Sequence, residues 1–245
     1  MKAFLLAAGK GSRLRPYTDA RPKCLIPIYG KPLLEIWIDL LKAHGIDRVL
    51  INTHHHAGQV EQVVNRLIIE KEIDIITVFE PELLGSGGTI LENRDFVGAG
   101  EDFLIAYADN LTDMNLSAMV AFHDTQRANG RVLTMGLFRT PTPEACGIAT
   151  LDSNQVITGF REKPEKPESN LANAGIYVAT YTILRECREI RQQVRAKVFD
   201  FGFHVLPRLV GRMGGYEIKE YLADIGTVES YRRALDQWPM KEKEL

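Results

Sequence analysis

The chain has 245 residues, of which 45% are hydrophobic and 25% charged, with a net charge of −2 and a pI of about 6.3. This balance is typical of a globular protein with a full hydrophobic core, and it argues against a protein that coats a polyanion such as nucleic acid. Three widely spaced cysteines form neither a disulfide framework nor a metal-ligand pattern, and no apolar stretch approaches the roughly 20 residues that cross a bilayer. We therefore expect a soluble, cytoplasmic protein with neither nucleic acid nor a membrane as its partner.

Apolar runs alternate with amphipathic segments along the first 140 residues, a pattern typical of helices wound around a parallel sheet. In chain order we predict strand Ala3–Ala7, a glycine-rich loop from Ala8 to Pro16, helix Pro32–His44, strand Arg48–Asn52, helix Gln59–Glu70, strand Ile73–Phe79, loop Glu80–Gly88, strand Phe103–Tyr107, helix Leu116–Ala128 and strand Val132–Arg139.

The rhythm changes from about Pro141. The predicted elements are a hairpin of Gly147–Leu151 and Val156–Phe160, strand Ala174–Val178, helix Ile183–Gln193, strand Tyr216–Tyr221, helix Val228–Leu235 and a frayed tail at Lys241–Leu245. No repeat or linker divides the chain. We therefore predict one domain, residues 1–245, of the α/β class: a Rossmann-like, mostly parallel sheet wrapped by helices over residues 1–140, with a smaller, hairpin-rich lobe over residues 141–227.

The segment that follows the first strand, Leu6–Leu14, is rich in small residues. Glycines there would let backbone N–H groups approach a phosphate, while Lys10 and Arg13 add cationic donors. Alone, this loop is better explained as a tight turn with solvated charges, because it lacks the third glycine of a dinucleotide fingerprint and the GKS/T of a P-loop. Lys23, which lies between two prolines in a stiff segment, is a second candidate for an anion contact.

Seven strings of residues, taken together, resemble the nucleoside-diphosphate-sugar pyrophosphorylases, a family of sugar-1-phosphate nucleotidyltransferases. They are Leu6-Ala-Ala-Gly-Lys-Gly-Ser-Arg-Leu-Arg-Pro-Tyr-Thr18, Pro22-Lys-Cys-Leu-Ile-Pro-Ile28, Leu84-Gly-Ser-Gly-Gly-Thr89, Tyr107-Ala-Asp-Asn110, Phe160-Arg-Glu-Lys-Pro164, Asn173-Ala-Gly-Ile-Tyr177 and Asp224-Ile-Gly-Thr227. The strings follow the family's order and cover almost the whole length. The pattern looks most like the mannose- and heptose-1-phosphate guanylyltransferases.

The chain also departs from its relatives in two places. Val228 stands where many of them carry proline. The chain ends soon after the last predicted helix, so we expect no C-terminal β-helix of the kind that some relatives carry. That expectation leaves the oligomeric state open, a homodimer included.

The resemblance implies transfer of a nucleoside monophosphate from a nucleoside triphosphate to a sugar 1-phosphate, with release of pyrophosphate. Residues 1–140 would mainly bind the nucleotide and residues 141–227 the sugar phosphate. Arg13 and Lys23 would be catalytic, with Arg13 on the leaving phosphates and Lys23 between the α-phosphate and the sugar phosphate. The nucleotide would contact Leu6, Ala7, Ala8, Gly9, Lys10, Gly11, Ser12, Gly85 and Gly88.

The resemblance also implies a Mg²⁺ site at Asp109 and Asp224, since two carboxylates suffice when phosphate oxygens complete the shell. The sugar-phosphate pocket would be lined by Gly147, Glu162, Lys163 and Asn173. Two alternatives stay open: Asp224 could cap the last helix, and Glu162 with Lys163 could be a solvated ion pair. Because two anions must meet at one phosphorus, we expect a single in-line attack assisted by cations, without a covalent intermediate.

The choice of base depends on the loop Glu80–Gly88. Guanine presents two N–H groups that can donate hydrogen bonds to a carboxylate, whereas the carbonyl oxygens of uracil and thymine would repel a carboxylate. Glu82 is the predicted acceptor and GTP the predicted donor, with Glu80 or the backbone of Ala7–Gly9 as alternative readers. UTP, dTTP and CTP remain alternative donors. A catalytically silent nucleotide-sugar-binding regulator is the alternative outside the enzymes, although it would be expected to lack Arg13, Lys23 or one aspartate.

Overall fold

The computed structural model describes residues 1–239, so the tail predicted at Lys241–Leu245 lies outside the described residues. Its main sheet consists of nine strands. These are β1 (Lys2–Leu6), β4 (Arg48–Thr53), β5 (Asp74–Phe79), β6 (Phe103–Tyr107), β8 (Leu133–Arg139), β9 (Gly147–Leu151), β10 (Ile157–Glu162), β11 (Leu171–Ala179) and β12 (Met213–Glu217). The order is β10-β9-β11-β6-β1-β4-β5, with β8 paired to β11 and β12 paired to β8.

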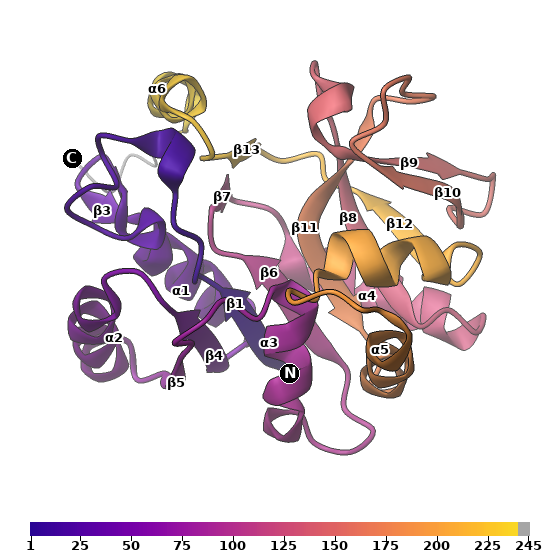
Figure 1. The fold of residues 1–245 in the computed structure, drawn as a ribbon, viewed down its shortest axis with the longest axis horizontal. Coiled ribbons are helices and arrows are strands. Elements are labelled where there is room, and N and C mark those ends of the chain that lie inside the picture. Colours follow the sequence, from indigo (N-terminus) through magenta and orange to yellow (C-terminus); the bar gives the residue numbers. More distant parts are fainter. Residues whose placement is uncertain (240–245) are drawn as a thin grey trace.

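The central strands β5, β4, β1 and β6 run parallel, and β12 is parallel to β8. Strand β11 reverses the direction, because it pairs antiparallel with both β6 and β8, and β9 and β10 form the predicted hairpin. Two short sheets join β2 (Pro27–Ile28) to β3 (Lys31–Pro32) and β7 (Asn110–Thr112) to β13 (Leu222–Asp224). The result is the predicted α/β fold with a mostly parallel centre (Figure 1).

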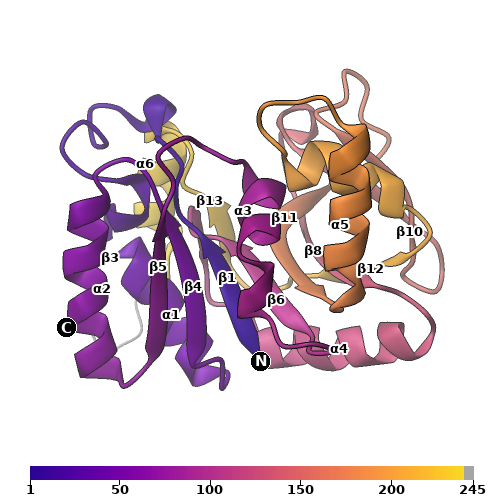
Figure 2. The same ribbon diagram turned by 60° about the horizontal axis from the view of Figure 1, so that its bottom comes forward.

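Within residues 1–239, six α-helices surround the main sheet (Figure 2). They are α1 (Leu33–Ala43), α2 (Ala57–Lys71), α3 (Ser86–Glu92), α4 (Leu116–Ala128), α5 (Thr182–Gln193) and α6 (Val228–Gln237). Short helical turns include η1 (Ser12–Leu14), η2 (Lys23–Leu25), η5 (Phe201–Val205) and η6 (Leu206–Leu209).

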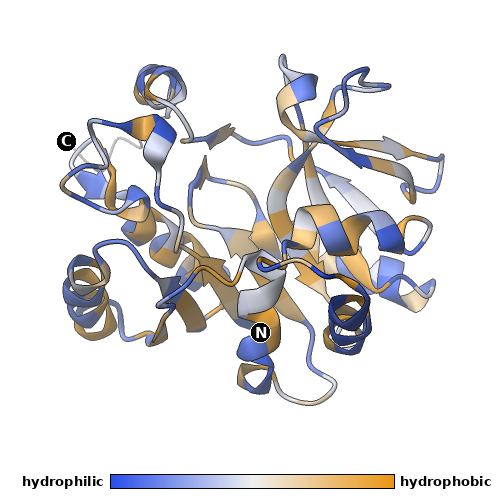
Figure 3. Cartoon of the chain, in the orientation of Figure 1, coloured by the Kyte–Doolittle hydropathy of each residue, from blue (hydrophilic) through white to orange (hydrophobic). Residues whose placement is uncertain are grey.

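Strand β1 shows how the sheet separates two cores. Ala3 and Leu5 pack with Trp37 of α1 in one cluster, whereas Phe4 points to the other face and packs in the cluster that holds Ile90 of α3. Successive side chains of a strand face opposite sides, so a strand covered on both faces is apolar at every position. The apolar interior and polar rim are visible in Figure 3. Across residues 1–239, no helix is long and apolar enough to cross a membrane.

Several predicted boundaries are wrong, including the start of β11, which lies at Leu171 and not at the predicted Ala174. The strand expected at Tyr216–Tyr221 is β12, which begins three residues earlier and ends at Glu217. Gly214 and Gly215 hide it, because glycine weakens a strand signal. A Cβ at Gly215 would lie 2.5 Å from Leu151, so a larger residue there would force that side chain to shift. Helix α3 also begins at Ser86, inside the predicted loop Glu80–Gly88.

Candidate active site

The loop after β1 turns sharply at Gly11, whose φ of +63° favours glycine. Thr18 donates its hydroxyl to the Gly11 carbonyl at 2.8 Å, and a Cβ on Gly11 would lie 2.8 Å from Thr18 and 3.1 Å from the Cβ of Lys23. The loop therefore folds directly over the start of η2. Lys10, Ser12 and Arg13 are exposed on it.

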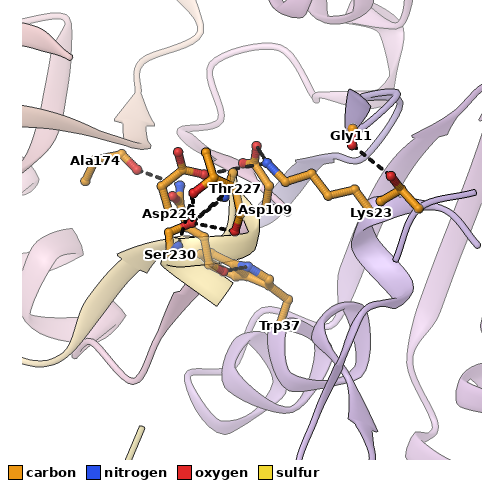
Figure 4. Close-up of polar contacts among 11 residues, drawn as sticks. Gly11, Lys23, Trp37, Asp109, Ala174, Asp224, Thr227 and Ser230 are labelled. Atoms are coloured by element: carbon orange, nitrogen blue, oxygen red, sulfur yellow. Dashed lines mark hydrogen bonds and ion pairs between the residues drawn. The ribbon is translucent and has the colours of Figure 1, made fainter. Parts of the chain in front are cut away.

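Lys23 joins two distant aspartates at the carboxyl edge of the sheet (Figure 4). Its Nζ lies 2.6 Å from Asp109 Oδ2 and 3.6 Å from Asp224 Oδ1. Lys23 is only 7% exposed, so the surrounding protein restricts the position of its ammonium group. The structure thus brings together three residues that the sequence analysis assigned to catalysis and metal binding.

The β7–β13 pair positions the two aspartates. Asp224 lies opposite Asn110 in this ladder, and the Ile225 amide donates to the Asp109 carbonyl at 2.9 Å. Two hydrogen bonds of Asn110 fix β7 in its place. The Trp37 indole of α1 donates to the Asn110 carbonyl, and the Asn110 side chain donates to the Ala174 carbonyl, each at 2.7 Å.

The surroundings of Asp224 suit a cation. Partial loss of hydration and then the negative charge of Asp109 raise the pKa of the Asp224 carboxyl, while Lys23 opposes the rise. A Cβ on Gly226 would lie 2.6 Å from Asp224 Oδ2, so the glycine makes room for this carboxylate. Helix α6 is capped by Thr227, which removes the alternative role of Asp224 as the cap. A second cation beside two crowded carboxylates would relieve their repulsion, so the residues present fit Mg²⁺.

The residues predicted for the sugar phosphate lie around the β9–β10 hairpin and β11. A Cβ on Gly147 would lie 2.5 Å from Glu162 Oε2, so Glu162 rests against the glycine backbone instead of standing free in solvent. Burial raises the pKa of the Glu162 carboxyl. Asn173 donates to the Tyr177 hydroxyl at 2.7 Å and accepts from the Gly175 amide at 2.9 Å. Lys163 lies with its Nζ 5.9 Å from the centre of the Phe203 ring.

The structure separates the two glutamates of the base loop. Glu82 has 71% of its side chain exposed and pairs with Lys197 at 3.0 Å. Glu80 is 4% exposed, and it accepts hydrogen bonds from the Asn52 amide at 2.8 Å and from the Leu84 amide at 3.1 Å. Glu82, the predicted contact for the base, thus lies on the surface, and Glu80, the alternative contact, is buried.

Asn52 was missed by the sequence analysis. Its Oδ1 accepts from the Ala7 amide at 2.7 Å, while its Nδ2 donates to Glu80. A single buried side chain therefore links the loop after β1 to the base loop. The Ala7 N–H therefore already has a hydrogen-bond acceptor within the protein. A lone asparagine ending a strand offers no signal for such a role.

Gly85 and Gly88, predicted to bind the nucleotide, make contacts within the protein. The Gly88 amide donates to the Phe199 carbonyl and the Phe199 amide to the Leu84 carbonyl, each at 2.9 Å. A Cβ on Gly85 would lie 2.6 Å from the Phe199 carbonyl oxygen, and the φ of Gly85 is +83°. Gly85 therefore lets the segment at Phe199 lie against α3, and the contact of both glycines with a nucleotide stays a prediction.

Across the described residues, no cluster of three or more His, Cys, Asp and Glu side chains is arranged to hold a metal. Cys24, next to Lys23, is buried, and burial raises the pKa of its thiol to about 12. It therefore stays protonated near neutral pH and is a poor nucleophile.

The structure thus combines a Rossmann-like sheet with a glycine-rich loop, a buried lysine and paired aspartates at its carboxyl edge. The family model described as "Nucleotidyl transferase" matches residues 2–239, and the chain belongs to this family.

Three relatives carry names that specify different nucleotides. The chain is 32% identical over 253 residues to a UTP–glucose-1-phosphate uridylyltransferase of Synechocystis and 31% identical over 251 residues to a glucose-1-phosphate adenylyltransferase of Desulfitobacterium hafniense. These alignments cover 96% and 95% of the chain, which spans 62% of the length of each relative. A third relative, named "Putative mannose-1-phosphate guanyltransferase", from Sulfolobus acidocaldarius, is 28% identical over 76% of the chain and half of its own length.

Two similar solved structures share the fold. A Bacillus anthracis protein, titled "Putative Glucose-1-Phosphate Thymidylyltransferase" and solved with sucrose, has a TM-score of 0.83 at 24% identity, covering 99% of this chain and 98% of its own. HddC from Yersinia pseudotuberculosis, complexed with GMP-PN, has a TM-score of 0.74 at 21% identity, covering 97% and 99%. The likeness is one of fold, because the identity is low.

Proposed function

We propose that the protein transfers a nucleoside monophosphate from a nucleoside triphosphate to a sugar 1-phosphate and releases pyrophosphate. The observation that carries this proposal is the contact of Lys23 with Asp109 and Asp224 at the end of β1 and β6. Family membership and the names of the relatives support it.

In this mechanism the chain supplies positions and charges, and no side chain forms a covalent bond to phosphorus. The exposed loop around Arg13 holds the leaving phosphates. Lys23 turns from the aspartates toward the phosphates when substrates enter, and its ammonium neutralises the charge that builds up between the attacking and leaving oxygens. Asp109 and Asp224 would hold Mg²⁺, which supplies Lewis-acid neutralisation of phosphate oxygens. Glu162, Asn173 and the Gly147 backbone orient the sugar.

GTP is the proposed donor, and a mannose- or heptose-type sugar 1-phosphate the proposed acceptor. The guanylyltransferase named among the relatives and the acidic base loop support GTP. Two carboxylates are candidate readers of guanine. Glu82 is exposed and paired with Lys197, whereas Glu80 is buried and linked through Asn52 to the loop after β1.

Replacing each glutamate by glutamine separates the two readers. The change keeps the size and substitutes an amide donor for one acceptor oxygen, so a reader of guanine should lose roughly ten- to a hundredfold in GTP use, equivalent to about 1–3 kcal/mol. The measurement is the ratio of kcat/KM for GTP to that for UTP in the wild type, Glu82→Gln and Glu80→Gln. A wild type that prefers UTP, dTTP or CTP would show that the guanine assignment is wrong.

The reaction itself is tested by pyrophosphate release from GTP, UTP, ATP, dTTP or CTP with a panel of sugar 1-phosphates. We expect release with at least one pair, abolished without a divalent ion and strongly reduced in Asp109→Asn and Asp224→Asn. A folded protein that binds nucleotide sugars but releases no pyrophosphate from any pair would instead favour the regulator, and the enzyme proposal would fail.

A further inference from the structure

Helix α6 lies beside the N-terminal segment that carries Lys23, and it begins shortly after Asp224 (Figure 1). The Ser230 hydroxyl in its first turn accepts from the amides of Gly226 and Thr227, at 3.1 and 3.0 Å. The Thr227 hydroxyl in turn accepts from the Ser230 amide at 3.1 Å and caps the helix. Asp224 is therefore joined to the first turn of α6 by a short, hydrogen-bonded stretch of backbone.

Tyr231, in the same first turn, contacts the Lys23 segment. Its hydroxyl donates to the Pro27 carbonyl at 2.7 Å. The Ile26 amide donates to the Lys23 carbonyl at 3.1 Å, so Pro27 follows directly on the hydrogen-bonded turn η2 that carries Lys23. Tyr231 is 6% exposed, and burial raises the pKa of its phenol, so near neutral pH the hydroxyl is protonated and can act as the donor.

The ring of Tyr231 also contacts the segment of Arg13. The Tyr17 ring lies edge-on to it, with the two ring centres 5.1 Å apart. Thr18, next to Tyr17, donates to the Gly11 carbonyl at 2.8 Å and so joins this contact to the loop after β1. One side chain of α6 therefore contacts both segments that carry the cations assigned to the reaction.

We propose that Tyr231 is a positioning residue of the transfer reaction, because its hydroxyl fixes the backbone of the Lys23 segment relative to Asp224. The inference rests on the proposed function and adds a residue to it. Lys23 reaches the aspartates through a long side chain, so the place of its ammonium depends on the place of its backbone. A side chain that turns from carboxylates to phosphates must do so from a fixed Cα, since a misplacement of about 1 Å can cost on the order of a hundredfold in rate.

The test begins with Tyr231→Phe, which keeps the ring beside Tyr17 and removes only the hydroxyl that holds Pro27. Pyrophosphate release should show kcat lowered about tenfold, with the KM for the nucleotide and for the sugar phosphate within twofold of the wild type. Tyr216→Phe is the matched control. It removes the hydroxyl of a half-buried tyrosine on β12 whose ring lies 5.6 Å from that of Phe122, and it should leave kcat unchanged.

A double-mutant cycle with Lys23→Met distinguishes positioning from a general effect on the fold. If the hydroxyl acts through the lysine, Tyr231→Phe has no ammonium to displace in the Lys23→Met background. It should then lower the remaining kcat, measured at high enzyme concentration, less than twofold. A purely structural role would lower kcat by the same factor in both backgrounds.

A kcat of Tyr231→Phe within twofold of the wild type would overturn the inference, as would a loss confined to KM. An equal loss in the two backgrounds, or an equal loss in Tyr216→Phe, would overturn it as well. Each of these results leaves the proposed function standing. A wild type that releases no pyrophosphate from any pair of nucleoside triphosphate and sugar 1-phosphate would overturn the proposed function together with the inference.

Discussion

Replacing Lys23 by methionine removes the positive charge that contacts Asp109 and Asp224. It keeps nearly the same side-chain length at a residue that is 7% exposed. A hydrogen bond to a charged group contributes about 1.5–3 kcal/mol. Since 38% of the Asp109 side chain and 55% of that of Asp224 are exposed, solvent screening reduces the contribution of these contacts to folding to about 1 kcal/mol. We expect Lys23→Met to destabilise the protein by about that amount. Turnover should fall a hundredfold or more, about 3 kcal/mol of transition-state stabilisation.

The response to Mg²⁺ distinguishes this role from a merely structural one. In the free wild type, Lys23 competes with a divalent ion for Asp109 and Asp224, and in Lys23→Met this competition is gone. A ligand that binds only the folded state stabilises it more when its affinity rises, so Mg²⁺ should raise the Tm of the variant more than that of the wild type. The assay is thermal unfolding over a Mg²⁺ titration, paired with pyrophosphate release. Lys219→Met, at an exposed lysine, is the control.

Two results would refute this reasoning about Lys23. One is near-normal pyrophosphate release from folded Lys23→Met, which would show that the ammonium stabilises no transition-state charge. The other is an identical Mg²⁺ shift of Tm in the variant and the wild type, which would show that the lysine and the metal do not share the aspartates.

Three further predictions concern positions outside the reaction centre. Gly85→Ala should cost about 1–3 kcal/mol in urea unfolding, because its φ is +83° and the new Cβ would lie 2.6 Å from the Phe199 carbonyl, whereas Gly58→Ala in α2, with open space around it, should not destabilise. Burial lowers the pKa of His123 below its ordinary value of 6.5, so the unfolded chain takes up the proton first. Stability should therefore fall as the pH drops below about 6.5, and His123→Gln should flatten this slope in unfolding curves between pH 7.5 and 5.5; an unchanged slope would contradict the assignment. Asn52→Ala removes a buried side-chain amide and leaves the Ala7 N–H and the Glu80 carboxylate without this partner. It should raise the KM for the nucleotide about tenfold and leave the KM for the sugar phosphate within twofold.

Much of the fold follows from local patterns. The apolar runs at β1, β4, β5 and β6 and the 3.6-residue periodicity of α1 and α2 are visible in the chain because strands and helices covered by a core need them. The start of β12 was misplaced because glycines that carry a tertiary role stand there. Gly214 and Gly215 lie within β12, and each packs closely against a side chain from elsewhere in the fold that the local sequence does not reveal.

For the site, the sequence proposed the residue types and the structure supplied their neighbours. Lys23, Asp109 and Asp224 were named from their strings, and the structure brings them into contact. Glu82 was named for the base, and the structure pairs it with Lys197 at the surface. Asn52 and Glu80 carry the buried link between the two loops, and their adjacency in space is set by the β4–β5 pairing that brings residues far apart in the chain together.

The sequence by itself determined the class of fold and the chemical groups available, because periodicity, glycines and charged side chains are local properties of the chain. The tertiary structure alone decided which groups meet. Asp224 reaches Asp109 because β13 pairs with β7, so that Asp224 lies opposite Asn110. The reversed strand β11, inserted between β6 and β8, carries Asn173, one of the residues predicted for the sugar phosphate. Strand pairing and helix packing join residues separated by more than a hundred positions, and their free energy depends on the whole fold, so no local pattern contains it.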